Sequence, residues 1–315
     1  MDMPKEMREA FGETLIELGH EFPNVIVLDA DLNTSSKTVY FKKAFPTRFI
    51  QCGIAEQNMF GIAAGLATQG FIPFPSTFAV FATRRALDQI SISIAYPKLN
   101  VKIPGSYVGV PTSRAGASHN AVTDLSNMRA LPHMRVADPG DNHELRAIMR
   151  AAVLTEGPIY FRITRYTLPD LFDADCEFNW GKGQRLLEGS DVTLVGTGIM
   201  TSPCLEAAEI LAKDRIWAEV LHCASVKPID VELIVASALK TGAVVTAENA
   251  TIIGGLGSAV AEVLGERAPA VLRRIGVRDR FIESGGISEL LAHHGMRPED
   301  IALAAREALE AKEKL

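Results

Sequence analysis

Short runs of β-branched and other apolar residues alternate along this chain with longer segments of helical period. Continuous apolar runs at 25–28 and 159–163 predict strands that are buried on both faces of a sheet. The other strands of this series are predicted at 48–52, 101–103 and 134–137, and the helices at 7–20, 56–69, 79–96, 120–131 and 142–155. Such alternation predicts an α/β fold with a mainly parallel sheet covered by helices on both faces.

The alternation stops over 169–190 and then resumes. This segment carries Pro169, several acidic residues and three glycines, with no sustained period, and is predicted to be a linker. A second, smaller α/β series follows, with strands predicted at 192–195, 218–222, 243–247 and 271–275 and helices at 204–212, 230–239, 257–264 and from 288 and 298 onward. The 315 residues are therefore predicted to form two parallel-sheet domains, 1–168 and 191–315.

Charge and composition exclude several classes of function. Lys and Arg number 32 against 38 Asp and Glu, and no segment concentrates positive charge, which argues against a nucleic-acid partner. The apolar stretches are shorter than the ~18 residues that span a bilayer, and the N-terminus lacks a signal pattern. The four cysteines are scattered without a C-x-x-C pair. We expect a reduced, cytoplasmic protein that contacts neither membrane nor nucleic acid.

Glu56 is the first candidate for chemistry. It follows a predicted strand and opens a helix that is almost wholly apolar and rich in small residues. Poor solvation at that place should raise the pKa of the carboxyl group and allow proton exchange near neutrality. Most glutamates in such a pattern, however, only match the dipole at the start of a helix.

Two further segments carry candidate residues. Phe78 and Phe81, three apart at the start of a helix, could wall a flat heteroaromatic ring or simply belong to the core. His119 ends a polar, glycine-containing loop, where it could shuttle a proton or merely polarise a helix start. The glycines of 254–258 do not form a G-x-G-x-x-G motif and are better explained by a tight turn. The other histidines show no metal-ligand spacing.

The order of these motifs resembles one enzyme family. G-I-A-E-Q-N-M around Glu56, S-T-F-A-V-F-A-T-R-R around Phe78 and Phe81, G-A-S-H before Asn120, and G-P-I-Y-F-R-I-T-R resemble the pyrimidine-binding domain of transketolases. The segment from Val192 onward is similar to the transketolase C-terminal domain. The resemblance runs from about residue 7 to residue 309 and implies those two α/β domains.

One family motif is absent. Thiamine diphosphate enzymes hold Mg²⁺ and the diphosphate with Gly-Asp-Gly followed by an Asn, and this chain contains no Gly-Asp-Gly. The resemblance therefore implies the C-terminal subunit of a split transketolase. A separate N-terminal subunit would carry the motif and hold Mg²⁺ or another divalent cation, so no metal ligand is expected here. We expect αβ pairs that close into an α₂β₂ complex, with the apolar helix after Glu56 buried at the interface. The chain alone should dimerise or aggregate.

The resemblance also implies roles for individual residues. Glu56 would hydrogen-bond the aminopyrimidine of thiamine diphosphate and favour its imino tautomer, and His119 would contact the reacting hydroxyls of the substrate. The residues implied to bind the cofactor are Asp31, Ile54, Phe78, Phe81 and Arg84. The residues implied to hold the substrate phosphate are Arg8, Ser35 and Arg165.

This sequence departs from the family pattern at three positions that, by the resemblance, contact the donor sugar. Tyr107 stands where transketolases carry His, Arg114 where Glu is common, and Ala115 where Asp reads a donor hydroxyl. We expect Tyr107 and Arg114 to contact a non-standard ketose phosphate (branched, epimeric or differently charged) whose two-carbon unit passes to an aldose phosphate. The alternatives are the β subunit of a 2-oxoacid dehydrogenase, a deoxyxylulose-phosphate-synthase-like enzyme, and a non-catalytic partner subunit.

Overall fold

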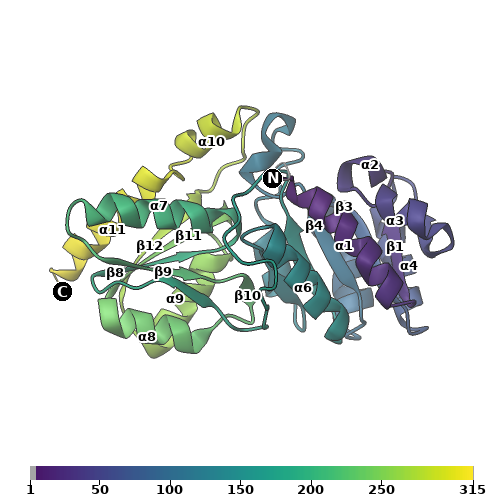
Figure 1. The fold of residues 1–315 in the computed structure, drawn as a ribbon, viewed down its shortest axis with the longest axis horizontal. Coiled ribbons are helices and arrows are strands. Elements are labelled where there is room, and N and C mark those ends of the chain that lie inside the picture. The colour runs from purple at the N-terminus through teal and green to yellow at the C-terminus, as the bar shows by residue number, and fades with distance from the viewer. Residues whose placement is uncertain (1–4, 315) are drawn as a thin grey trace.

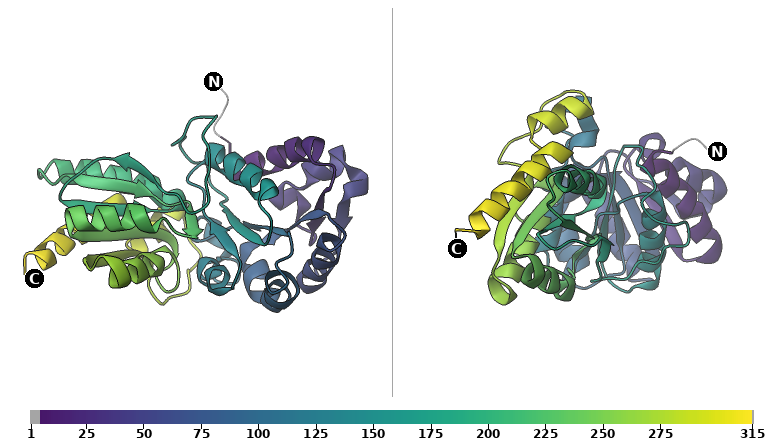
Figure 2. Two further views of the ribbon diagram at one scale, coloured as in Figure 1. Left: turned by 90° about the horizontal axis from the view of Figure 1, so that it is seen from below. Right: turned by 60° about the vertical axis from the view of Figure 1, so that its left-hand side comes forward.

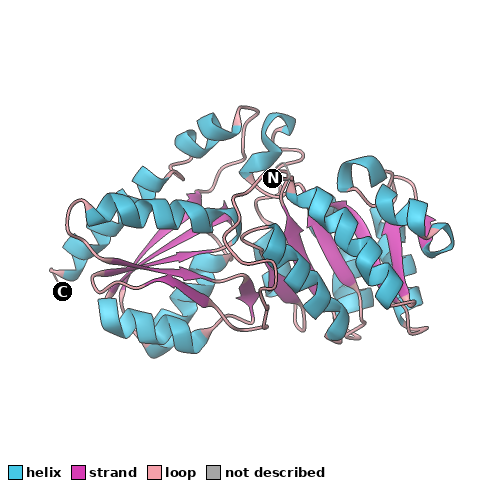
Figure 3. Ribbon diagram, in the orientation of Figure 1, coloured by secondary structure: helices cyan, strands magenta, loops and turns pink. Residues whose placement is uncertain are grey.

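The computed structural model describes residues 5–314 as two α/β domains that lie end to end along the long axis of the molecule (Figure 1). Each domain contains a mainly parallel sheet between two layers of helices, as Figure 3 shows by secondary structure. The predicted fold class is confirmed. No helix within residues 5–314 is both long and apolar enough to cross a membrane.

The first sheet has the strand order β10-β5-β6-β4-β3-β1-β2. Its parallel strands are β1 (Val25–Asp29), β2 (Phe49–Gln51), β3 (Ile72–Phe78), β4 (Lys102–Ser106), β5 (Arg135–Ala137) and β6 (Ile159–Ile163). The last member, β10 (Ser225–Lys227), comes from the second half of the chain and pairs antiparallel with β5. Because parallel strands end at one edge, the candidate residues after β1, β3 and β4 are brought to the same side of the sheet.

Helices cover both faces of this sheet. One core contains Phe11 and Phe161 and is closed by α1 (Met7–Glu21), α3 (Val39–Ala44) and α6 (Asn142–Leu154). The opposite core contains Met59 and Tyr160 and is closed by α4 (Glu56–Ala67), α5 (Asp124–Ala130) and the π-helical turn η3 (Gln89–Ala95). Short turns complete the domain: α2 (Asn33–Ser36), η1 (Pro46–Arg48), η2 (Phe81–Arg85) and η4 (Val110–Ala115).

The second sheet has the order β12-β11-β8-β9-β7. Its strands are β7 (Gln184–Leu187), β8 (Val192–Gly196), β9 (Ala218–His222), β11 (Ala243–Thr251) and β12 (Val271–Val277). One face packs on η5 (Gly198–Met200), α7 (Thr201–Ala212) and α11 (Pro298–Lys312), and the other on α8 (Val231–Thr241) and α9 (Leu256–Arg267). The remaining helix, α10 (Ile287–His293), extends from this domain toward the first one, as the turned views in Figure 2 also show.

Three sequence predictions need correction. The predicted helix over 120–131 begins only at Asp124, because Ala121 forms a parallel bridge with Val108 and is therefore extended. The predicted helix over 79–96 is wound largely as the π-helical turns η2 and η3. The C-terminal end of the predicted linker is the strand β7, which pairs antiparallel with β9 at the sheet edge.

A buried ion network joins the two domains. Arg162 on β6 is 1% exposed and donates to both carboxylate oxygens of Asp124 at 2.8 and 3.1 Å and to Asp138 at 2.9 Å. The same guanidinium also donates at 2.9 Å to the carbonyl of Asn249 on β11, in the second domain. One guanidinium group thus satisfies two buried carboxylates and a strand carbonyl across the junction.

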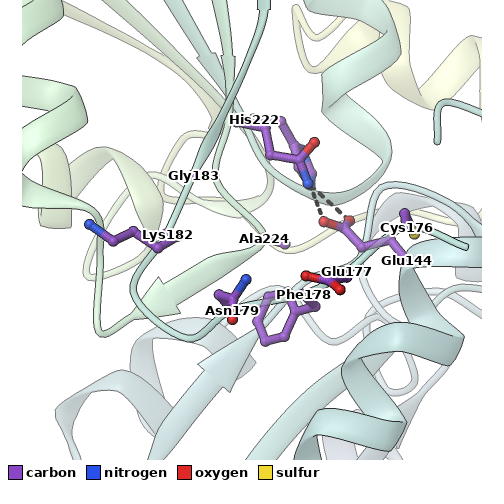
Figure 4. Close-up of a pocket in the computed structure, with 10 residues that line it drawn as sticks. Glu144, Cys176, Glu177, Phe178, Asn179, Lys182, Gly183, His222 and Ala224 are labelled. Atoms are coloured by element: carbon purple, nitrogen blue, oxygen red, sulfur yellow. Dashed lines mark hydrogen bonds and ion pairs between the residues drawn. The ribbon is translucent and has the colours of Figure 1, made fainter. Parts of the chain in front are cut away.

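A second junction contact lies beside a cavity of about 390 Å³ (Figure 4). His222 Nε2 hydrogen-bonds both carboxylate oxygens of Glu144 at 2.8 and 3.0 Å, and His222 Nδ1 lies 2.6 Å from Thr201 Oγ1. Glu144 comes from α6, whereas His222 and Thr201 come from the second domain. None of the candidate site residues lines this cavity. Because the hydrogen bonds of His222 and Glu144 join α6 to the second domain, we interpret this cluster as a structural contact that holds the two domains together.

Glu248 gives the second domain a testable dependence on pH. Its buried carboxylate accepts from the backbone N–H groups of Leu256 and Gly257, both at 2.8 Å, at the start of α9. Burial raises the pKa of Glu248 to about 7 despite those two bonds. Between its ordinary pKa and about 7 the folded state binds more protons than the unfolded state, so this group lowers stability as pH rises through that window.

We therefore compare the free energy of unfolding of Glu248→Gln with that of the native protein. The difference should shift in favour of the variant by about 1–3 kcal/mol as pH rises from 5 to 8. Gln can still accept one of the two backbone bonds, and it does not titrate. Urea unfolding of both proteins at four pH values measures the difference. Contributions from other titrating groups cancel in that difference, and a value independent of pH would contradict the assignment.

Candidate active site

Glu56 lies where α4 begins, and its side chain is buried. Only 1% of the residue is exposed, so the predicted poor solvation is confirmed. Arg85 Nη1 donates to both oxygens of the Glu56 carboxylate, at 2.9 and 2.8 Å. This partner could not be singled out from the sequence, where Arg84 and Arg85 are adjacent and a π-helical turn decides which of them faces Glu56.

Two phenylalanines and a histidine form an aromatic group at the end of β3. The rings of Phe78 and Phe81 are stacked at 22° with centroids 5.8 Å apart. The imidazole of His119 meets both rings edge-on, 5.4 Å from Phe81 and 6.0 Å from Phe78. Phe81 also lies beneath the guanidinium of Arg85, 4.3 Å from the ring centroid, so this group adjoins Glu56.

Tyr107 connects the aromatic group to two arginines. Its ring stacks on Phe78 at 4.1 Å, and its backbone has a φ of 62°, which is uncommon for a bulky residue. Arg8 Nη1 donates to the Tyr107 hydroxyl and to the carbonyl of Ser35, each at 3.1 Å, and Arg165 lies 5.3 Å from the Tyr107 ring centroid. Arg8 Nε also forms an ion pair with Glu6 at 2.5 Å. The remaining N–H donors of the two guanidinium groups suit an anionic substrate group.

The other candidate residues lie toward the surface. Arg84 points to Thr123 Oγ1 at 3.5 Å, and Arg114 is exposed on η4. Asp31 is exposed just after β1, with a φ of 63°. Ile54 is 76% exposed in the turn before α4. The structure thus brings Glu56, Phe78, Phe81, His119, Tyr107, Arg8, Ser35 and Arg165 into one connected group.

The second domain supports the loop that carries Tyr107 and His119. The side chain of Asn249, on β11, accepts from Val110 N at 2.9 Å. Gly116 has a φ of 72°, and a Cβ there would lie 2.7 Å from Ser284 Oγ. Helix α10 contacts η4 in this loop, and Figure 1 shows α10 beside the blue turn at the top of the molecule. No local sequence signal indicated these contacts, because they join residues more than a hundred positions apart.

Gly109 lies in close contact with the Asn249 side chain, which supports this loop. Its φ of 59° is left-handed, and a Cβ there would overlap the Asn249 side chain. We expect Gly109→Ala to lower the free energy of unfolding by about 2–4 kcal/mol, from backbone strain and overpacking together. Gly265→Ala is the matched control, because Gly265 lies in α9 with open space at its Cβ and should gain about 0.5–1 kcal/mol. Equal effects of the two changes in urea unfolding would contradict this account.

Exposed apolar side chains lie around α4, the helix that begins at Glu56. Ile54 before α4 and Ile92 and Tyr96 around the end of η3 are 76%, 61% and 79% exposed. Gly61 and Gly65 present open space on α4, so that another backbone could approach closely there. Large apolar side chains exposed around one helix make this helix a candidate for a protein–protein interface.

The described residues fit one part of a thiamine cofactor. Glu56 and Phe81 already hold a planar cationic group between them, so a carboxylate and an aromatic face are placed to bind an aminopyrimidine. Within residues 5–314, no cluster of three or more His, Cys, Asp or Glu side chains is arranged to hold a metal ion.

Comparisons with known proteins identify the family of both domains. Residues 3–170 match the transketolase pyrimidine binding domain, and residues 181–301 match the transketolase C-terminal domain. The chain is 45% identical over 306 residues to the 6-deoxy-6-sulfo-D-fructose transketolase subunit SqwH of Clostridium sp. (strain MSTE9), covering 97% of this chain and 95% of that one. It is 36% identical to one subunit of the apulose-4-phosphate transketolase of Phocaeicola vulgatus, covering 95% and 96%. A solved split-gene transketolase, described as an inactive β₄ tetramer, is 51% identical with a TM-score of 0.91 and covers 97% of this chain and 99% of its own.

Proposed function

The chain belongs to the transketolase family, and from that we propose that it is the C-terminal subunit of a split, thiamine diphosphate-dependent transketolase. The observation that carries the proposal is a buried Glu56 carboxylate and a Phe81 ring that contact the same guanidinium, that of Arg85, in a chain without a Gly-Asp-Gly motif. The pyrimidine half of a cofactor site is present, and the half that would hold the diphosphate and Mg²⁺ belongs to another polypeptide.

Each residue of the connected group has a task in this proposal. Thiamine diphosphate, when bound, supplies the electron sink that carries the two-carbon unit. Glu56 accepts a hydrogen bond from a ring nitrogen of the aminopyrimidine and so holds a proton on that atom. Phe81, with Phe78 beside it, orients the flat ring by stacking. Asp31, Ile54 and Arg84 line the outer side of the cofactor at the subunit interface.

His119, Arg8 and Arg165 bind the sugar substrate in this proposal. The imidazole of His119, edge-on to Phe81, hydrogen-bonds the hydroxyls at the reacting end of the substrate. Arg8 and Arg165, with Ser35 beside them, bind the anionic end of the substrate. Because His119 binds one end of the sugar and the arginines bind the other, the sugar is held in one orientation. Tyr107 and Arg114 contact the part between, where Ala115 leaves no carboxylate to read a donor hydroxyl.

We propose a non-standard ketose phosphate as donor and an aldose phosphate as acceptor. The support is the Tyr107 phenol, which lies between Phe78 and Arg8, together with the names of two relatives. One name gives a sulfonated ketose, 6-deoxy-6-sulfo-D-fructose, and the other gives apulose 4-phosphate. The partner subunit would bury the exposed apolar side chains around α4, giving an α₂β₂ enzyme in the cytoplasm. Without that partner the chain would associate with itself, as the related β₄ tetramer does.

The test is to purify the tagged chain from its own cells with whatever binds it and to assay the complex. A co-purified polypeptide with a Gly-Asp-Gly motif, together with two-carbon transfer between sugar phosphates, supports the proposal. Xylulose 5-phosphate turned over at ordinary transketolase rates would contradict the non-standard donor. Release of CO₂ from a 2-oxoacid with reduction of an artificial acceptor would instead identify a 2-oxoacid dehydrogenase subunit. Consumption of pyruvate with a sugar phosphate would indicate a deoxyxylulose-phosphate-synthase-like enzyme.

A further inference from the structure

Arg85 contacts both groups that the proposed cofactor site needs, the Glu56 carboxylate and the Phe81 ring. Its Nη1 lies 2.9 and 2.8 Å from the two oxygens of Glu56, and its guanidinium carbon lies 4.3 Å from the centroid of the Phe81 ring. The Arg85 backbone also meets α4, because Gln57 Nε2 donates to the Arg85 carbonyl at 3.0 Å. The guanidinium is therefore a planar cation that stacks on an aromatic face and donates to a buried carboxylate.

An aminopyrimidine bound as proposed makes the same two contacts. It is planar, it stacks on Phe81, and it donates a hydrogen bond to Glu56. A group that meets both requirements must lie within hydrogen-bond distance of the carboxylate and within stacking distance of the ring. That space holds the Arg85 guanidinium, and the two groups cannot occupy it together.

The geometry points to Arg85 as a further residue of the cofactor site, one that occupies the aminopyrimidine position until the cofactor displaces it. This inference rests on the proposed function. Its physical reason is the cost of a buried carboxylate: without a cation or donor beside it, Glu56 would be buried with its lost solvation uncompensated. Arg85 supplies that cation in the cofactor-free chain and can withdraw to water, because 46% of its side chain is exposed.

Displacement of Arg85 must weaken cofactor binding. We expect Arg85→Met to tighten the binding of Mg²⁺–thiamine diphosphate to the cofactor-free complex by about tenfold, measured by calorimetric titration. Arg85→Lys keeps a cation but lacks the planar fork, so its affinity should lie between those of Arg85→Met and the native complex. Arg150→Gln is the matched control, because Arg150 forms a surface ion pair with Glu21 on the first domain and should leave the affinity unchanged.

The outcomes separate this inference from the proposed function. Equal or weaker binding by Arg85→Met, in a complex whose native form binds the cofactor, would overturn the placeholder role and leave the proposed function standing. If neither the native complex nor any variant binds the cofactor, the proposed function is refuted, and the inference about Arg85 falls with it.

A second measurement needs neither cofactor nor partner. In the chain alone, Arg85→Met should lower the midpoint of thermal unfolding, because it leaves Glu56 buried without its cation. The same change made in Glu56→Gln should have little effect, since the neutral amide does not need a cation. Equal shifts in the two backgrounds would show that Arg85 and Glu56 are not coupled and would overturn the inference.

Discussion

Glu56→Gln is expected to lower two-carbon transfer by the assembled enzyme by about 10²- to 10⁴-fold, the range that one positioned acid–base group contributes. Gln has nearly the same shape as Glu, but its amide cannot hold a proton on the ring nitrogen as a carboxylate does. Because Glu56 is 1% exposed and faces its own domain's Phe81 and Arg85, the subunit contacts should survive the change.

The measurement is the transfer rate at saturating sugar phosphates, with the mass of the complex determined in parallel. Glu17→Gln is the matched control, since Glu17 is exposed on α1 and has no part in the site. An intact complex with nearly normal activity would contradict the role of Glu56 and favour a non-catalytic partner subunit. Loss of the complex itself would show that Glu56 supports assembly rather than chemistry.

Arg162→Met is expected to cause the largest loss of stability, about 3–5 kcal/mol. The substitution fills similar space but leaves Asp124 and Asp138 buried without their cation, and it removes the donor to the Asn249 carbonyl. Burial already raises the pKa of Asp138 even with Arg162 beside it, and loss of Arg162 would raise this pKa further. Because Arg162 joins both domains, they should also lose cooperativity in unfolding.

Urea unfolding followed by circular dichroism measures this loss. Arg150→Met, which breaks an exposed ion pair with Glu21, should change stability by less than about 0.5 kcal/mol. Arg162→Lys should recover only a small part, because a single ammonium nitrogen cannot reach the four acceptor atoms that the planar guanidinium spans. A loss below about 1 kcal/mol for Arg162→Met would show that the network contributes little to stability.

Much of the fold could be predicted because its signals are local. β9 spans 218–222 and β6 spans 159–163, the ranges predicted from the alternation of strands and helices. The errors come from long-range contacts. Residues 225–227 pair with β5 across the domain junction, and Ala121 is extended because it meets Val108. Neither partner can be identified from residues within one helical turn or one strand.

The site divides in the same way. Glu56, Phe78, Phe81 and His119 could be selected because each stands at the end of a strand or the start of a helix, and motif order linked them. Arg85 could not, because one extra residue in a π-helical turn turns it toward Glu56 and turns Arg84 toward Thr123. The support from Asn249 and Ser284 depends on how the two domains pack.

Calorimetric titration of Mg²⁺–thiamine diphosphate tests the central claim most directly. The titration is made into the chain alone and into the complex purified from its own cells. We expect saturable binding by the complex only, since the chain offers the pyrimidine contacts and its partner the diphosphate and metal contacts. Tight binding by the chain alone would contradict the split-site account, and no binding by the complex would contradict a thiamine diphosphate enzyme altogether.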